Sequence, residues 1–546
     1  MDTKRLVLFI VFSFSIMMLW DAWQVKDAPK NLDTVSTKTA PVDTSIPAAS
    51  TEVTPSVNAS NTTSFQLDTD ELVKVETDLY VAEISTTGGD LRRLTLKKHL
   101  ADDKKAGNFV LLDDTNNPVL YIAQSGLIGQ NLPNHKSQFV SDASNYMMDS
   151  TADALSVKLS WQENGVSVDK IYTFNRGRYE VDVTHHIVNE SGNELHPSVY
   201  YQLLHDNESN QGSTFMPTFT GGAYYTEADK FKKLSFDDMA DTNLSLKTKD
   251  GWVGVIQHYF ASAWIPKSGT TNEFYTKQLS DQIYAIGLVN PVGAVPSTSS
   301  VDVSATLFSG PQSAPALEAA APGLEYAVDY GWLTVIAKPL FWLLSKIHSF
   351  IGNWGVAIII LTILLKAAFF KLSATSYRSM AHMREMAPRM QAMKEKFGDD
   401  KQALQQAMME MYRKEKINPL SGCLPILVQI PVFIALYWVL LGSVELRHAP
   451  FFGWITDLSA KDPYYILPIL MGASMIIQTY LNPAPADPIQ AKVMKIMPVV
   501  FSIFFFFFPA GLVLYWLVNN ILSIAQQWYI NKTIHAETIA KKGAKR

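Results

Sequence analysis

A single lysine interrupts a long apolar run in the second half of the chain. Residues 356–370 read VAIIILTILLKAAFF, and Lys366 is the one charged residue among them. None of the other long apolar runs carries an internal acidic residue to pair with it. A lysine at the centre of a bilayer-spanning helix costs ~2.5 to 3.5 kcal/mol on insertion scales, so such residues usually face protein or a water-filled cavity. We therefore expect a hydrated, positively charged hollow within a helical membrane protein.

Snorkelling is the alternative interpretation of Lys366. The residue precedes Lys371 by about 7.5 Å along a helix, so its flexible stem would reach the inner headgroups. Against this, Lys371 already marks the membrane boundary, and Thr362 extends the polarity one turn deeper. The cavity interpretation places the opening toward the cytoplasm and within the inner leaflet.

The chain divides into an acidic part and a basic part. Of its 546 residues, 47% are hydrophobic, too many for a wholly soluble protein and too few for a wholly membranous one. Residues 22–365 contain 24 lysines and arginines and 38 aspartates and glutamates, a net charge of −14, whereas the remaining segments sum to +9. This difference in charge indicates that the two parts of the chain face different compartments. The single cysteine, Cys423, excludes an intrachain disulfide and a cysteine-based metal site.

The N-terminal segment resembles a membrane anchor. Lys4 and Arg5 precede an apolar stretch, and no small-residue cleavage pattern follows it. We expect an uncleaved transmembrane anchor at residues 1–23; a removed signal peptide is the alternative, because the stretch is short for a full span. Residues 24–64, rich in Thr, Ser, Pro and Ala, are expected to form a disordered linker.

Short alternating segments occupy residues 65–322. Residues 79–84, 166–174 and 179–185 alternate apolar and polar side chains, and turn residues separate such segments. The pattern predicts one large antiparallel β-sandwich with its own core. The histidines that suggest a metal or acid–base site are His185, His186, His196 and His205. They lack ligand spacing, so we interpret them as ordinary surface or core residues.

Further apolar segments bring the predicted number of membrane spans to six. After the anchor, residues 351–372 form the second span, and residues 419–530 hold spans three to six, with Pro509 and Gly511 dividing the last block into a tight hairpin. Residues 323–350 predict an amphipathic helix that lies flat on the outer membrane surface or, alternatively, packs under the β-domain.

Charge orients these spans. The loop at residues 371–416 has a net charge of +4, and the tail at residues 531–546 also has +4. Together with Lys4 and Arg5, these charges place both termini inside and the β-domain outside. The positive charge of the tail would attract ribosomal RNA and anionic lipid equally, so the sequence does not distinguish these two partners.

The inner loop at residues 373–418 predicts a cytoplasmic helical hairpin that breaks near Gly398. Its methionines either zip the two arms together or offer an adaptable apolar surface to varied clients. The methionines that we assign to client reception are Met380, Met383, Met390, Met393 and Met408.

Polar residues recur within the predicted spans. They include Thr362, Gln429, Ser474, Trp516 and Asn520. Singly, such residues hydrogen-bond helices together. Beside an unpaired lysine, they better fit the lining of a shared cavity, for which we select Thr362, Gln429, Trp516 and Asn520.

Several longer segments carry a family resemblance. They are NPLSGCLPILVQIPVF at 418–433, FPAGLVLYW at 508–516, DYGW at 329–332, IHSF at 347–350, GSVELR at 442–447 and DPYYILP at 462–468. Together they resemble the YidC membrane protein insertases of Gram-negative bacteria, and the match covers the whole chain in organisation.

The resemblance implies a non-enzymatic inner-membrane insertase and chaperone without a cofactor. It also implies a five-helix core and a periplasmic β-supersandwich. The implied partners are nascent membrane protein segments, the Sec translocon, the ribosome with the signal recognition particle pathway, and the phospholipid bilayer.

The resemblance also assigns roles to residues. Lys366 occupies the position of the groove cation, which is generally arginine in the family, and Trp516 replaces a tyrosine. A lysine cannot form the planar fork of hydrogen bonds that arginine forms, so a bidentate mechanism is in doubt here whereas attraction by positive charge is not. The apolar slide for clients would consist of Ile430, Pro431, Phe433, Val499 and Phe504.

A groove that stops partway through the membrane shortens the path of a client's polar flank, and Lys366 would attract acidic residues in that flank. Burial of the client's apolar run, at ~25 cal/mol per Å², would drive release without a nucleotide.

Three alternative functions fit the sequence less well. A secondary transporter would show inverted repeats and an intramembrane acid, and the sequence shows neither. A sensor would have a cytoplasmic output domain, whereas the inner segments form only a hairpin and a short basic tail. A sugar-processing enzyme would need paired carboxylates, which the sequence does not place together.

Overall fold

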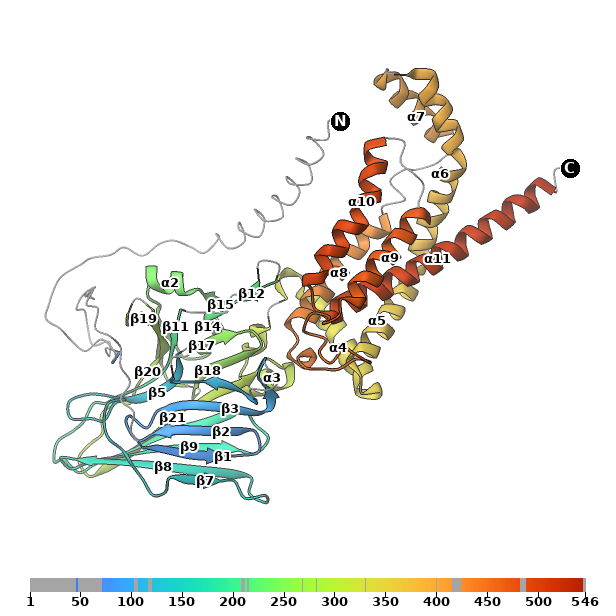
Figure 1. Cartoon of the computed structure of the whole chain (residues 1–546). Helices are drawn as coiled ribbons and strands as arrows, with labels where there is room; N and C mark the ends of the chain where they lie inside the picture. Colours follow the sequence, from blue (N-terminus) through green and yellow to red (C-terminus); the bar gives the residue numbers. More distant parts are fainter. Residues whose placement is uncertain are drawn as a thin grey trace.

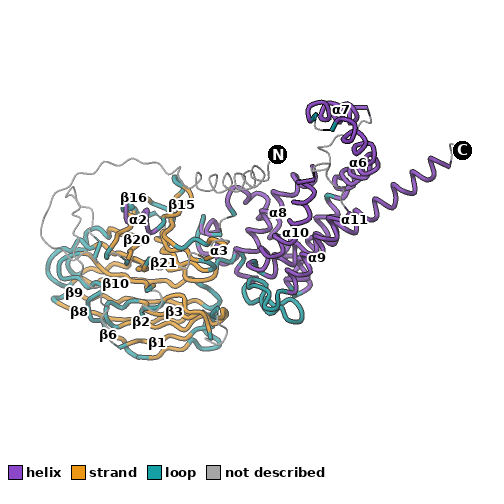
Figure 2. The backbone as a smooth tube through the Cα atoms, turned by 45° about the horizontal axis from the view of Figure 1, so that its top comes forward, coloured by secondary structure: helices purple, strands orange, loops and turns teal. Residues whose placement is uncertain are grey.

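The computed structural model describes residues 46–47, 71–102, 107–115, 120–207, 212–213, 216–267, 269–280, 282–328, 330–398, 400–414, 424–481 and 488–543. The predicted anchor at 1–23 lies outside these residues, as does nearly all of the predicted linker at 24–64. The described chain forms a body of strands followed by a body of helices, which lie side by side (Figures 1 and 2).

Two large sheets form the β-domain. The first runs in the order β16 (Ser245–Thr248), β19 (Asn272–Gln278), β20 (Ile283–Pro291), β11 (Ser198–Asp206), β5 (Tyr121–Ile128), β3 (Leu91–Leu100), β2 (Tyr80–Ser85), β1 (Leu72–Glu76) and β7 (Asn145–Met147), with β4 (Asn108–Leu112) paired to β3. The second runs in the order β15 (Lys230–Leu234), β14 (Gly221–Thr226), β17 (Trp252–Gln257), β18 (Phe260–Pro266), β21 (Ser299–Pro311), β10 (Glu180–Asn189), β9 (Val166–Asn175), β8 (Ala154–Glu163) and β6 (Val140–Ser141). A short pair, β12 (Gly212–Ser213) and β13 (Met216–Pro217), stands apart from both, and α2 (Phe236–Asp241) follows β15.

Alternation along the strands builds the core of this sandwich. In β9 every second side chain is buried, starting at Val166, and in β10 the buried set starts at Val181. These inward side chains and those of the opposite sheet form one hydrophobic cluster. The predicted alternation at residues 166–174 and 179–185 therefore corresponds to strands that bury one face.

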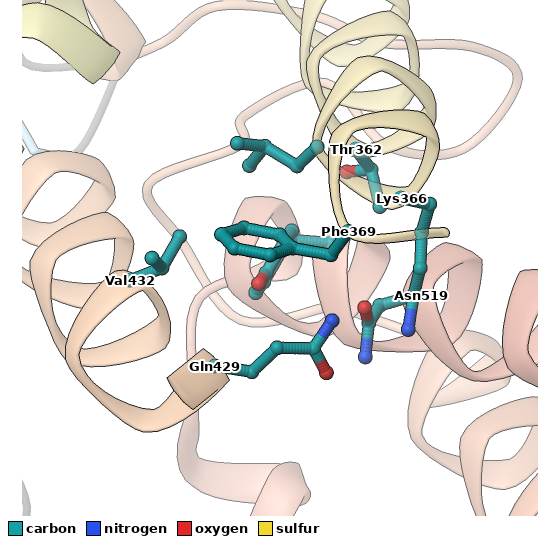
Figure 3. Close-up of a pocket in the computed structure, with 8 residues that line it drawn as sticks. Thr362, Lys366, Phe369, Gln429, Val432 and Asn519 are labelled. Carbon is teal, nitrogen blue, oxygen red and sulfur yellow. The ribbon is translucent and has the colours of Figure 1, made fainter. Parts of the chain in front are cut away.

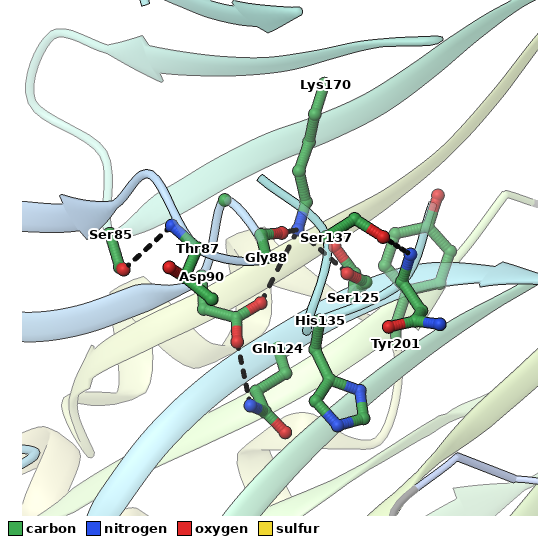
Figure 4. Close-up of polar contacts among 12 residues, drawn as sticks. Ser85, Thr87, Gly88, Asp90, Gln124, Ser125, His135, Ser137, Lys170 and Tyr201 are labelled. Atoms are coloured by element: carbon green, nitrogen blue, oxygen red, sulfur yellow. Dashed lines mark hydrogen bonds and ion pairs between the residues drawn. The ribbon is translucent and has the colours of Figure 1, made fainter. Parts of the chain in front are cut away.

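One inward position of β9 holds a lysine rather than an apolar residue. Lys170 is fully buried, and its Nζ donates to the carbonyl oxygens of Gly88 and Ser125, both at 2.8 Å (Figure 4). The Asp90 carboxylate lies 3.7 Å from the ammonium and accepts from Gln124 at 2.7 Å. This polar group joins the two sheets through the centre of the sandwich, and burial lowers the pKa of Lys170 to about 8 despite Asp90.

The four histidines occupy separate positions in the β-domain. His185 and His205 are buried, His186 lies 2.6 Å from Asp302, and His196 lies beside Glu194. Burial lowers the pKa of His185 well below its usual value, and Lys170, its cross-strand partner, lowers it further. His185 is therefore a neutral core residue.

Helices follow the last strand. They are α3 (Ala314–Ala320), α4 (Thr334–Ile351), α5 (Trp354–Ala368), α6 (Phe370–Phe397), α7 (Lys401–Lys414), α8 (Leu424–Gly442), α9 (Ile466–Leu481), α10 (Pro488–Phe504) and α11 (Ala510–Gly543). Short 3₁₀ turns are η2 (Leu324–Ala327), η3 (Gly331–Leu333), η5 (Val444–Leu446) and η6 (Phe505–Phe507). Helices α6 and α7 form the two arms of a hairpin that projects from the bundle, and the C-terminal part of α11 projects separately (Figure 1).

The amphipathic helix is shorter than the 323–350 segment that we predicted. Gly323 and Gly331 adopt positive φ angles of 80° and 57°, which a continuing α-helix does not allow, and α4 starts at Thr334. Leu324 packs with the β-domain, whereas Leu333 packs with the helices. Helix α4 contacts α5 and α8 through one face and exposes residues such as Trp342 and Phe350 on another.

The predicted second span, residues 351–372, is bent. Helix α5 ends at Ala368, and α6 continues at an angle of 66° to it. Gln526 of α11 donates to the carbonyl oxygen of Phe370 at 3.2 Å, so the bend has a hydrogen-bond partner on a neighbouring helix.

Only the α5–α6 pair has the length and hydropathy of a membrane span within the described residues. The pair Trp354–Ala368 and Phe370–Ala381 meets both criteria together across its bend, whereas each single helix falls short of them. Val428–Gly442 and Ile466–Leu481 are apolar but shorter. The number of six spans remains a prediction.

Candidate functional site

Three helices enclose a pocket around Lys366. Helix α5 and the residue that ends it contribute four side chains, α8 contributes two and α11 contributes two (Figure 3). The lining residues are Thr362, Leu365, Lys366, Phe369, Gln429, Val432, Tyr515 and Asn519. The apolar residues of these helices that face away from the pocket, such as Leu361, Val439 and Val513, pack into the core of the bundle. The helices are therefore fixed against one another where the pocket forms.

Within the described residues, the Lys366 ammonium has one hydrogen-bond partner, which is neutral. Its Nζ donates to the Ser523 Oγ at 2.8 Å, and that hydroxyl donates to the Asn519 carbonyl oxygen at 2.7 Å. No carboxylate neutralises Lys366 among the residues that the structure describes. The positive charge thus stays uncompensated within the part of the pocket seen here.

The other polar groups of the pocket differ in which hydrogen-bonding atoms they leave available. The Thr362 hydroxyl donates to the Ile358 carbonyl oxygen at 2.7 Å within its own helix, which leaves its lone pairs as acceptors. Gln429 reaches from α8 toward Asn519 and Lys366 (Figure 3). The pocket therefore offers a cation, amides and a hydroxyl acceptor, which are groups that can hydrogen-bond water or the polar groups of a peptide.

The structure places the predicted lining residues in two groups. Thr362, Lys366 and Gln429 meet in the pocket. Trp516 instead packs between Phe433 and Phe505, with ring centroids at 4.6 and 4.8 Å.

Asn520, the remaining predicted lining residue, turns to another helix and donates to the Ser474 Oγ at 2.7 Å. On α11 the neighbouring row, Tyr515 and Asn519, faces the pocket. Tyr515 and Asn519 have the same i, i+4 spacing as Trp516 and Asn520. The spacing therefore predicts a helix but does not predict which of the two rows faces the pocket.

The predicted slide residues lie on α8 and α10. Ile430 and Val499 are exposed, at 42% and 51% of their surface, whereas Pro431, Phe433 and Phe504 are half-buried. Phe504 packs on Phe508 with ring centroids 4.7 Å apart.

The methionines of the hairpin differ in exposure and contacts. Met390 accepts from the Tyr412 hydroxyl of the opposite arm at 3.4 Å, and Met380, Met393 and Met408 are half-buried. Met409 is exposed at 66%, and the Met383 side chain lies outside the described part of the structure. Met390 therefore contacts the opposite arm, whereas Met409 leaves its side chain available on the surface.

Fold and site define a two-part protein, in which a large β-sandwich domain is attached to a bundle of apolar helices around Lys366, a cation with no carboxylate partner in the described part of the chain. The family model for the YidC periplasmic domain matches residues 72–343, and the model for the 60Kd inner membrane protein matches residues 346–537. The chain belongs to the YidC family of membrane protein insertases.

Individual relatives agree over their full length. The membrane protein insertase YidC of Methylobacillus flagellatus is 62% identical over 548 residues, covering 100% of this chain and 99% of the relative. The YidC of Aromatoleum aromaticum is 53% identical and covers 100% of both chains. A crystal structure of an active YidC insertase with its first transmembrane domain resolved aligns with 18% identity and a TM-score of 0.40, covering 85% of this chain and 93% of that one.

Proposed function

We propose that this chain inserts nascent membrane proteins into the bacterial inner membrane and assists their folding, alone or with the Sec translocon. Clients arrive from ribosomes, including those on the signal recognition particle pathway. The supporting observation is the pocket shared by α5, α8 and α11, with Lys366 uncompensated by a carboxylate among the described residues. An insertase needs such a place, because a client's polar flank resists crossing hydrocarbon.

In the proposed topology six helices span the membrane. Both termini and the α6–α7 hairpin are cytoplasmic, the β-domain is periplasmic, and the amphipathic helix lies at the outer membrane surface. The pocket opens toward the cytoplasm and the inner leaflet, so a short polar flank enters it and crosses only part of the bilayer. The uncompensated charge of Lys366 attracts acidic residues of this flank.

Release of the client proceeds into lipid. The apolar segment leaves along the exposed parts of α8 and α10, where Ile430 and Val499 lie, and its burial at ~25 cal/mol per Å² provides the driving force. No nucleotide or cofactor takes part.

Charge variants of Lys366 test this function. Lys366→Arg should retain insertion of a client with an acidic flank, Lys366→Gln should reduce it, and Lys366→Glu should reduce it most, because an acidic side chain repels the flank. A client with the same apolar segment and a neutral flank is the matched control and should distinguish the variants less. Equal insertion of the acidic client by all three variants would exclude Lys366 from the mechanism.

We further propose that the hairpin receives clients before they reach the pocket. Removal of residues 380–413, with a short flexible linker in their place, should lower insertion while the β-domain and the remaining helices stay folded. Undiminished insertion of every client tested would reduce the hairpin to a connector.

A further inference from the structure

We infer that Ser523 is a positioning residue for the groove cation, and that it fixes where Lys366 presents its charge. The inference concerns how the proposed insertion site is built, and only its insertion readout rests on the proposed function. Ser523 lies on α11, whereas Lys366 lies on α5, so the hydrogen bond joins two helices through residues that are 157 positions apart in sequence.

Ser523 lies on a face of α11 that contacts both α5 and α6. Ser523 is 5% exposed, and Gln526, one turn further on, is 9% exposed. Ser523 holds the Lys366 side chain, and Gln526 donates to the Phe370 carbonyl oxygen. Positions three apart share one face of a helix. One face of α11 therefore holds α5 before its end and α6 after it, on both sides of the 66° bend.

The chemistry of the contact leaves the ammonium available. A lysine ammonium has three N–H donors and no acceptor. Ser523 accepts a hydrogen bond from Lys366 and donates its own O–H to the Asn519 carbonyl oxygen, so the hydroxyl hydrogen points away from the cation. The serine is neutral, so it orients the lysine without cancelling its charge. Two N–H donors have no partner among the described residues and are available for water or for a client carboxylate in the pocket.

A carboxylate at the same place would act in the opposite way. It would form an ion pair with Lys366 and remove the attraction for an acidic flank. We therefore expect the hydroxyl, and not merely any hydrogen-bond acceptor, to be the useful group at position 523.

Acylation of Lys366 measures this contact without reference to insertion. The full-length protein in lipid nanodiscs is exposed briefly to a water-soluble acylating reagent, and the modified fraction of the Lys366 peptide is read by mass spectrometry. Hydrogen bonds to charged groups contribute ~1.5 to 3 kcal/mol, so Ser523→Ala should raise the acylation rate by about tenfold or more. Ser523→Thr, which keeps the hydroxyl, should remain close to the parent protein.

Ser502→Ala is the matched control. The Ser502 Oγ donates to the Pro468 carbonyl oxygen at 3.0 Å in the same helical bundle, away from the residues that line the pocket. This variant loses a comparable hydrogen bond and should leave Lys366 acylation unchanged. An acylation rate in Ser523→Ala equal to that of the parent, or a rise of the same size in Ser502→Ala, would overturn the inference.

Insertion of the acidic-flank client then separates this inference from the proposed function. Ser523→Ala should lower insertion when Lys366 is present and have no further effect in Lys366→Gln, because the serine acts through the lysine. Ser523→Asp should lower insertion about as much as Lys366→Gln. If acylation responds to Ser523→Ala while Lys366→Gln inserts normally, the positioning role stands and the proposed function fails.

Discussion

The Arg447 guanidinium, in the loop that follows α8, donates to the Asp102 carboxylate of the β-domain with an N···O distance of 2.7 Å. The same guanidinium donates to the Leu100 carbonyl oxygen and lies over the rings of Phe109 and Phe260, 5.1 and 5.5 Å from their centroids. Its side chain is only 4% exposed although Asp102 is 88% exposed. Arg447 thus joins the loop after α8 to the β-domain, and the His258 Nε2 contact with the Leu441 carbonyl oxygen, at 3.0 Å, is a second polar contact between the two parts.

Replacing Arg447 should loosen this docking. Arg447→Ala removes two charge-assisted hydrogen bonds and two cation–π contacts, together at least about 2 kcal/mol. Amide exchange in the loop at 443–447 and in β18 should accelerate correspondingly, as measured by mass spectrometry on the full chain. The control is Lys230→Ala, which breaks an exposed pair with Glu227 on the β-domain surface. Unchanged exchange in Arg447→Ala would show that the domains are held by other contacts.

Acidification should weaken the same contact through His99. Burial, and next the charge of Arg447, lower the pKa of His99 to about 4. Its unfolded value is near 6.5, so the folded state binds fewer protons between these values. The stabilisation that His99 contributes is therefore present above pH ~6.5 and is lost as the pH falls through the folded pKa.

The pH dependence has a direct control. Amide exchange in the docked loop should increase between pH 6.5 and 4 after correction for intrinsic rates, and His99→Gln, which cannot titrate, should show less of this increase. A profile that is identical in both proteins would assign the effect to other groups.

Lys170 should be a major determinant of β-domain stability. Lys170→Met removes the ammonium partner of the fully buried Asp90 and leaves the Arg92 guanidinium, 3.7 Å away, as its remaining cationic partner among the described residues. Breaking a buried pair in this way costs about 3–5 kcal/mol. Urea unfolding followed by the circular dichroism of the β-domain measures the change. Lys158→Met on the adjacent strand is the comparison, because its side chain is 46% exposed and its pair with Asp169 spans 3.9 Å, so it should cost less than about 1 kcal/mol. Equal midpoints for the two variants would contradict this account of the sandwich interior.

The β-sandwich was predicted from the alternation of apolar and polar residues along its strands. Strands such as β9 and β10 bury one face, and alternation reports that face directly. Lys170 departs from it, because an isolated lysine in an alternating strand indicates an exposed position by composition alone. Its partners Gly88, Asp90 and Ser125 come from other strands and connections, which a local pattern does not relate to it.

The pocket was predictable in part for a similar reason. An isolated charge in an apolar run marked Lys366, and Thr362 one turn away shared its face. The rotation of α11 depends on packing against α5 and α9, so the sequence could not distinguish Tyr515 and Asn519 from Trp516 and Asn520. The bend after Ala368 contains no proline or glycine, and its partner Gln526 is distant in sequence.

Water access to the pocket is the most direct test of the central claim. Single cysteines replace Thr362 and Gln429 in a Cys423→Ser background, and a membrane-impermeant maleimide is added to the cytoplasmic face of sealed vesicles. Ile363→Cys, an exposed apolar position on α5, serves as the lipid-facing control, and Met409→Cys on the hairpin serves as the exposed one. We predict that Gln429→Cys reacts within about tenfold of Met409→Cys, because a hydrated thiol ionises normally. Thr362→Cys, which is buried deeper in the pocket, should react more slowly but measurably, and Ile363→Cys should stay unreactive. Pocket cysteines as unreactive as Ile363→Cys would contradict a hydrated groove around Lys366.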